Sequence, residues 1–123
     1  MYSAAVLDHF QNPRHVGDIV SPDASVELQN PACGDILRLS VKIAAARVAE
    51  ARFRAKGCVP AIACGSRLSE MMHGRSVEEL QSLRREDLVE SLGGLPPASS
   101  HAGHLAMDAL AAVVKQVTPS TQT

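Results

Sequence analysis

The chain has 123 residues, of which 46% are hydrophobic and 2% aromatic, and its formal net charge is −1. This length suits one domain with its own core, and the hydrophobic content excludes a disordered protein. The balanced charge and the scarcity of aromatic side chains argue against a nucleic-acid-binding protein that relies on a basic surface or on base stacking.

The N-terminal residues lack the features of a targeting segment. No basic region precedes Asp8, which comes too early for a signal peptide, and no apolar run approaches the length of a membrane span. We therefore expect a cytoplasmic protein that does not enter a membrane. In that compartment the three cysteines are expected to be thiols or metal ligands rather than parts of a disulfide framework.

In chain order, the residue pattern predicts one short helix followed by strands. Ser3 is a candidate N-cap for a helix that runs to about Phe10, with Val6, Leu7 and Phe10 on one side. Alternation of apolar and polar residues predicts a weak strand over 25–29 and two stronger strands over 36–43 and 48–55. Because the link between the last two is short, they should pair as an antiparallel hairpin.

In the second half of the chain, the residue pattern predicts helices over about 60–73, 77–83, 85–92 and 101–117. The order of a helix, then strands, then helices predicts an α+β fold with a short antiparallel three-stranded sheet packed against helices. We expect residues 1–117 to form a single domain and residues 118–123 to form a disordered tail.

One cysteine lies where a predicted strand meets a predicted helix. Cys58 comes just before Pro60, and proline suits the first turn of a helix because its missing N–H costs nothing there. At a helix N-terminus the dipole and the free N–H groups favour a thiolate, the form that binds metals and attacks sulfur. The alternative is a buried cysteine that fills a corner of the core.

The predicted hairpin brings a second cysteine towards the first. Cys33 precedes the first strand of the hairpin and Cys58 follows the second, so antiparallel pairing places both at the same end of the sheet. Asp35 comes two residues after Cys33. Two thiols and a carboxylate are therefore expected to converge on one small site.

Further candidate ligands lie on the predicted helices. His101 and His104 share a helix face at a spacing that suits two metal ligands, although such pairs also occur by chance. Cys64 lies about one turn into the central helix and is either a ligand or a core residue. Thiols together with imidazole suit zinc or an iron–sulfur cluster rather than magnesium or calcium.

Four segments of the chain match signature sequences of one known family. Residues 8–17 read DHFQNPRHVG, close to DHYxNPRNVG, and residues 31–35 read PACGD, close to PxCGD. Residues 51–64 are similar to ARFKxxGCxxAIAS, and residues 95–101 match LPPxxxH. In order and spacing the chain thus resembles the IscU/NifU-type iron–sulfur cluster assembly scaffolds over nearly its whole length.

The resemblance implies a SufE/NifU-like α+β fold and the role of a carrier rather than an enzyme. Members of the family receive sulfur as persulfide from a cysteine desulfurase, combine it with iron into a 2Fe–2S cluster, and pass the cluster to acceptor apoproteins. Zinc can occupy the same ligands. By position, Cys33 and Cys58 correspond to two ligand cysteines, Asp35 to the aspartate associated with a labile cluster, and His101 to the neighbouring histidine.

The chain departs from the family pattern at two places. The family has His-Cys where this chain has His101-Ala102, whereas Cys64 stands where the family usually has serine, which we interpret as compensation. The family's chaperone-recognition segment LPPVK reads LPPAS over residues 95–99, and the missing basic residue argues against recognition by the usual Hsp70-type chaperone. The sequence leaves open whether the active form is a monomer or a dimer.

Three hypotheses follow. The first is a scaffold that holds a cluster on Cys33, Cys58 and Asp35, with Cys64 or His101 as a further ligand. The second is a zinc protein that uses the same residues without assembling a cluster. The third is a persulfide-accepting sulfurtransferase with Cys58 or Cys64 as its nucleophile.

Overall fold

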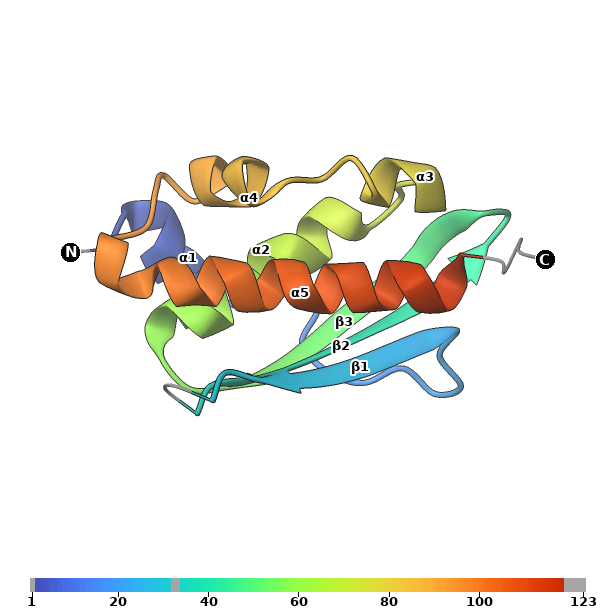
Figure 1. The fold of residues 1–123 in the computed structure, drawn as a ribbon, viewed down its shortest axis with the longest axis horizontal. Coiled ribbons are helices and arrows are strands. Elements are labelled where there is room, and N and C mark those ends of the chain that lie inside the picture. The colour runs from blue at the N-terminus through green and yellow to red at the C-terminus, as the bar shows by residue number, and fades with distance from the viewer. Residues whose placement is uncertain (1, 32–33, 119–123) are drawn as a thin grey trace.

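The computed structural model describes residues 2–31 and 34–118, and it has the α+β architecture that the sequence predicts. One sheet contains three antiparallel strands in the order β1-β2-β3. The strands are β1 (Ala24–Gln29), β2 (Ile36–Ala44) and β3 (Arg47–Lys56). Figure 1 shows the sheet on one side of the molecule and the helices on the other.

The helices cover one face of this sheet. They are α1 (Ala4–Gln11), α2 (Val59–Met72), α3 (Val77–Leu80), α4 (Arg85–Ser91), the 3₁₀ turn η1 (Pro97–Ser99) and α5 (Ser100–Val117). Helices α2 and α5 pack directly on the sheet, and α1 packs beside α2. In Figure 1 α3 and α4 lie beyond α2 and α5, on the side away from the strands. No helix of the described residues is long and apolar enough to cross a membrane.

The predicted hairpin is confirmed as the pair β2–β3. Ile36 pairs with Lys56 at one end, and the strands turn through Ala45 and Ala46 at the other. Both alanines have positive φ angles, 54° and 62°, which is the backbone of the two-residue turns that match strand twist. The register leaves the residues just before β2 beside those just after β3.

Alternation along the strands separates a buried face from a solvated one. The core draws on the buried strand residues Leu37, Leu39, Val41 and Phe53 and on helix residues that include Leu68, Met72, Leu110 and Val113. On the other face, Arg38 makes ion pairs with Asp18 and Glu27 in solvent. The division is not complete, because Ser40 on the other face is also buried.

The first helix begins as predicted but buries a different residue. Ser3 caps α1, and its side chain accepts a hydrogen bond from the Val6 amide at 3.0 Å. Of the three apolar residues expected on one side of this helix, Val6 is fully buried, but Leu7 and Phe10 are 40% and 37% exposed. His9 is buried in their place, because its ring has a hydrogen-bond partner inside the protein.

Smaller differences concern helix limits. The central helix begins at Val59, so Pro60 is its second residue rather than its first. The helix capped by Ser76 ends at Leu80 rather than near Leu83, and the 3₁₀ turn over Pro97–Ser99 directly precedes the last helix. Thr118, the first residue of the tail expected over 118–123, is the C-cap of α5. The other residues of that tail lie outside the described residues, so the tail stays a prediction.

Candidate functional site

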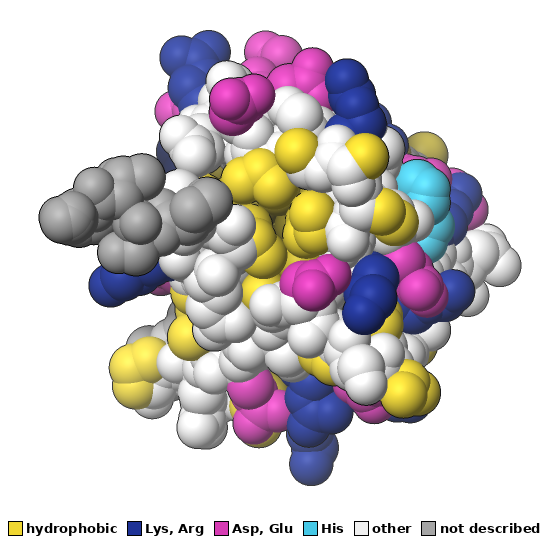
Figure 2. All heavy atoms as spheres, turned by 90° about the vertical axis from the view of Figure 1, so that its right-hand side faces the viewer, with side chains coloured by type: hydrophobic (Ala, Val, Ile, Leu, Met, Phe, Trp, Pro, Cys, Tyr) yellow, Lys and Arg dark blue, Asp and Glu magenta, His cyan; other side chains and the backbone are white. Residues whose placement is uncertain are grey.

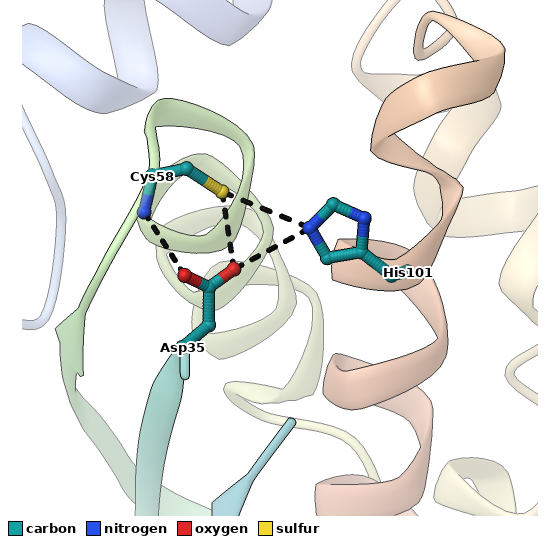
Figure 3. A group of neighbouring side chains, drawn as sticks. All are labelled: Asp35, Cys58 and His101. Atoms are coloured by element: carbon teal, nitrogen blue, oxygen red, sulfur yellow. Dashed lines mark hydrogen bonds and ion pairs between the residues drawn. The ribbon is translucent and has the colours of Figure 1, made fainter. Parts of the chain in front are cut away.

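Three side chains of different elements meet near the ends of β2, α2 and α5. Asp35 precedes β2, Cys58 is the N-cap of α2, and His101 is the second residue of α5. Each offers one ligand atom, and these atoms all lie within 4.8 Å of one another. Figure 3 shows the three side chains pointing toward one another. Among the described residues this is the one group of three or more thiol, imidazole and carboxylate side chains that is close enough to hold a metal ion.

The hairpin register brings the first two of these residues together. Ile36 pairs with Lys56. Asp35, which precedes Ile36, therefore lies beside the residues that follow Lys56. Gly57 lies between Lys56 and Cys58, and its φ of +142° is a backbone conformation that residues other than glycine rarely adopt. A Cβ atom at Gly57 would lie 2.1 Å from Asp35 Oδ1. The absence of a side chain at position 57 is therefore what gives the Asp35 carboxylate its place.

Asp35 is the polar centre of the group. It is only 3% exposed, and its carboxylate accepts the backbone N–H of Cys58 at 3.3 Å and the Cys58 thiol at 3.1 Å. Its Oδ2 atom lies 3.5 Å from Nε2 of His101. A carboxylate held by neighbouring donors is oriented before any metal ion arrives, which lowers the cost of binding.

Cys58 is confirmed at the N-terminus of the central helix. It is half-buried and has an extended backbone conformation. Its carbonyl accepts the N–H of Ala61 in the first turn of the helix. Its side chain does not cap the helix. The sulfur instead points at Asp35 and lies 3.9 Å from Nε2 of His101. The helix dipole at this end favours a negative charge on the sulfur.

The sulfur of Cys64 is not part of this group. Cys64 is fully buried in the core that α2 makes with the sheet. Burial raises the pKa of its thiol to about 12, and the neighbouring Cys58 adds to the rise. At neutral pH this thiol is protonated and is not accessible to solvent. Cys33, the remaining candidate thiol, lies outside the described residues.

The polar contacts of His9 and Ser66 were not predicted from the sequence. Ser66 Oγ lies 2.7 Å from His9 Nδ1 and accepts the backbone N–H of Arg14 at 2.9 Å. Glu70 lies 3.6 Å from the other ring nitrogen of His9. With Ser66 fully buried, the arrangement joins α1 to α2 and is not an accessible catalytic centre.

An apolar hollow lies at the opposite end of the molecule. Figure 2 shows hydrophobic side chains at its floor, and the cavity has a volume of about 500 Å³. Ile43, Val77 and Val117 line it together with Glu78 and Gln81. The described residues that line it include neither a thiol nor an imidazole, so the hollow does not share the chemistry of the Asp35, Cys58 and His101 group.

The donor set of this group is mixed. It offers a sulfur, a nitrogen and an oxygen atom from three side chains, of which Cys58 and His101 are partly exposed and Asp35 is buried. Thiolate and imidazole suit zinc and iron, whereas a carboxylate is a harder ligand that exchanges more readily on such metals. The residues present therefore fit the binding of a thiophilic metal with at least one replaceable ligand.

Comparison with known proteins finds a family that the chain matches over nearly its whole length. The family model of the NifU-like N terminal domain matches residues 1–122. The iron–sulfur cluster assembly scaffold protein IscU 1 of Archaeoglobus fulgidus is 43% identical over 110 residues, which are 89% of this chain and 72% of that protein. IscU of Azotobacter vinelandii is 41% identical over 118 residues, covering 93% of this chain and 91% of that protein.

A solved structure supports the fold independently. The N-terminal part of a nitrogen-fixing NifU-like protein from Brucella abortus superimposes with a TM-score of 0.76 at 19% identity. The match covers 94% of this chain and 92% of that one. The SufE/NifU-like arrangement expected from the signature segments is thereby confirmed in its NifU-like form.

Proposed function

The chain belongs to the family of NifU-like N-terminal domains, and from this premise we propose that it is an iron–sulfur cluster assembly scaffold. The relatives that match over nine-tenths of its length carry that name. The observation that carries the proposal is the convergence of Asp35, Cys58 and His101 within 4.8 Å. A scaffold holds its cluster for transfer, so the role is that of a carrier rather than an enzyme.

We propose Cys58, Asp35 and His101 as ligands, with Cys33 as the further thiolate on the basis of its place in the sequence. The two thiolates would bind iron most strongly, and bound sulfide would bridge the iron atoms. Asp35 is the weakest of these ligands for iron in a cluster. Its replacement by a ligand from an acceptor protein gives the cluster a way to leave.

Cys64 does not fit the role of a replacement ligand. To reach iron bound at Asp35 and Cys58, its thiol would have to leave a fully buried position and lose a proton held with a pKa of about 12. We propose that Cys64 is a core residue and that the ligand count is completed by His101.

Anaerobic reconstitution with ferrous iron and sulfide tests both proposals. The wild-type chain should develop sulfur-to-iron absorption in the visible range and acid-labile sulfide, with 2Fe–2S as the cluster type that we expect. Cys58→Ser should abolish both signals, whereas Cys64→Ala should retain them. A cluster of wild-type yield in Cys58→Ser would refute the ligand assignment, and its loss in a folded Cys64→Ala would restore Cys64 as a ligand.

A zinc protein is the second candidate, and the mixed sulfur, nitrogen and oxygen donors favour it as well. The same reconstitution separates the two functions. A wild-type chain that retains zinc through dialysis and forms no cluster would support the zinc function and refute the scaffold function.

As a scaffold, the chain needs a sulfur donor and acceptors, which we propose to be a cysteine desulfurase and apoproteins that require a cluster. If sulfur arrives as persulfide, the accessible acceptor among the described cysteines is Cys58. Its thiolate would attack the outer sulfur of the desulfurase persulfide, the S–S bond would break, and the desulfurase cysteine would leave as thiolate. Mass spectrometry should then find one added sulfur on Cys58 and none on Cys64.

A further inference from the structure

A second group of ligand-bearing side chains lies beside the first, on the exposed face of α5. His101, His104 and Asp108 follow one another at spacings of three and four residues. At 3.6 residues per turn these positions fall within about 60° of one another around the helix axis. Three potential ligands therefore project from one stripe of α5.

The same three residues line a cavity of about 240 Å³. Asn30 and Pro31, in the β1–β2 connection that leads to Asp35, also line it. The cavity is large enough for a hydrated metal ion, for which one water-sized volume is about 30 Å³. It thus adjoins the Asp35, Cys58 and His101 group and shares His101 with it.

His104 and Asp108 are free to take part in binding. Both are exposed, and within residues 2–31 and 34–118 no hydrogen bond or ion pair engages either side chain. The neighbouring Ala102 is turned into the core at 1% exposure, so the outward face of this part of α5 belongs to the histidines and the aspartate. The donor atoms of His101, His104 and Asp108 do not lie as close together as those of the Asp35, Cys58 and His101 group, so the exposed side chains have to rotate towards one another to close around an ion.

Two imidazoles and one carboxylate, with the remaining positions open, are a ligand set typical of ferrous iron. We propose that His101, His104 and Asp108 form a loading site that takes up Fe²⁺ from solution and supplies it to Cys58 and Asp35. The cation site stands on these residues alone, whereas its loading role rests on the proposed scaffold function. The site contains no thiolate, so an ion can bind there without displacing a proton from sulfur.

His101 provides the connection between the two sites. Its Nε2 atom lies 3.5 Å from Asp35 Oδ2 and 3.9 Å from Cys58 Sγ. Figure 3 marks both contacts with dashed lines. In the transfer Fe²⁺ keeps an imidazole ligand, loses His104 and Asp108, and gains the Cys58 sulfur and the Asp35 carboxylate. The Cys58 thiol releases its proton to solvent as the sulfur binds, and iron stays ferrous throughout.

Cobalt(II) titration in a Cys58→Ser background tests the cation site. Co²⁺ reports its ligands in its visible spectrum. In this background an ion held by His101, His104 and Asp108 shows nitrogen and oxygen ligands only, whereas an ion held by the remaining thiol of Cys33 shows sulfur-to-cobalt absorption. The full chain with Cys58→Ser should bind Co²⁺, and adding His104→Ala or Asp108→Asn should weaken binding at least about tenfold. Adding His73→Ala instead, which removes an exposed histidine from the end of α2, should leave the affinity unchanged.

Loading is tested in chains that retain Cys58. With limiting Fe²⁺, His104→Ala should form the cluster at least about tenfold more slowly than wild type, and with excess Fe²⁺ it should reach the same yield. Equal Co²⁺ affinity with and without His104 in the Cys58→Ser background would overturn the cation site. Wild-type cluster formation rates in His104→Ala at limiting Fe²⁺ would overturn its loading role.

The two proposals fail in different ways. If wild type forms no cluster while Co²⁺ binding still depends on His104, the scaffold function is refuted and the cation site stands. If wild type forms a cluster while His104 has no effect on Co²⁺ binding, the cation site is refuted and the scaffold function stands.

Discussion

Asp35 owes its position to the glycine that faces it. A methyl group at position 57 would overlap the Asp35 carboxylate, with Cβ 2.1 Å from Oδ1 and 2.7 Å from Cγ. Gly57→Ala should therefore push Asp35 away from Cys58 and His101 and lower the affinity for Co²⁺ at least about tenfold. The affinity would be measured by titration with the cysteines reduced.

Gly74→Ala is the matched control for this change. Gly74 also has a positive φ, +84°, but nothing lies within 4 Å of its Cβ position. Gly74→Ala should lower the free energy of unfolding by about 1–3 kcal/mol but keep the wild-type affinity for Co²⁺. Equal affinities in the two variants would show that Gly57 does not position Asp35.

The thiols of Cys58 and Cys64 should differ sharply in reactivity. Cys64 is fully buried with its pKa raised to about 12, whereas Cys58 is half-exposed at a helix N-terminus. Iodoacetamide should therefore label Cys58 in the native protein and leave Cys64 unlabelled until urea unfolds the chain. Peptide mass spectrometry identifies the labelled residues. Rapid labelling of Cys64 in the native state would contradict its burial.

At the scale of elements, a glycine allows the close approach of α2 to the sheet. A Cβ atom at Gly65 would lie 2.6 Å from the ring of Phe53 and 3.1 Å from Leu37, both buried. Gly65→Ala should therefore lower the free energy of unfolding by about 1–3 kcal/mol. Urea denaturation followed by circular dichroism measures this loss.

Gly103 in α5 offers the opposite case. Its Cβ position makes only ordinary contacts, at 3.5 Å to Arg85 and 3.6 Å to Val89. Gly103→Ala should raise the free energy of unfolding by about 0.5–1 kcal/mol, because alanine loses less backbone entropy in a helix. A change of stability in the same direction in Gly65→Ala and Gly103→Ala would show that contact with the sheet does not require glycine at position 65.

The junction of α1 and α2 should make stability depend on pH. Burial, and then the positive charge of Arg14, lower the pKa of His9 from its usual 6.5, although Glu70 acts in the opposite direction. Because Ser66 Oγ already accepts the Arg14 N–H, its own hydrogen is free to be donated to a neutral His9 ring. The folded state therefore favours an uncharged His9.

The sign of the dependence follows from linkage. The unfolded chain takes up a proton at His9 near pH 6.5, and the folded chain takes it up at a lower pH. The stabilisation is fully present above pH 6.5 and is lost as the pH falls towards the pKa of the folded state. His15, whose pKa burial also lowers, acts in the same direction.

Urea denaturation at about pH 7.5 and 5.5 measures the effect. His9→Asn keeps an acceptor for Ser66 but does not titrate in this range, so it should lose less stability between the two pH values than wild type. His104→Ala removes an exposed histidine and should behave as wild type does. An unchanged pH dependence in His9→Asn would refute the role of His9.

At the scale of the whole molecule, the site joins elements that are far apart in the sequence. Asp35, Cys58 and His101 belong to the starts of β2, α2 and α5, so a bound metal ion would hold three parts of the fold together. Zn²⁺ should raise the free energy of unfolding by about 2.7 kcal/mol at a free concentration of 100 times its dissociation constant. Cys58→Ser should lose most of this gain and Cys64→Ala should keep it. An equal gain in Cys58→Ser would place the ion elsewhere.

The sequence alone determined the order of the elements and two of the three residues of the candidate site. Alternating apolar residues and the short link predicted the hairpin. Antiparallel pairing then required the residue before β2 to lie beside the residues after β3. The proximity of Asp35 and Cys58 could therefore be predicted from the hairpin alone. The signature segments determined the family and pointed to His101.

Only the tertiary structure decided which of the remaining candidates reach the site. His101 is 43 residues from Cys58 and arrives through the packing of α5 on the sheet, and Cys64 is turned away by the packing of α2. The burial of His9 and the close contact at Gly57 were decided in the same way. Hairpin register depends on neighbouring residues and the turn between them, whereas the face that a helix buries depends on the fit of side chains distant in sequence.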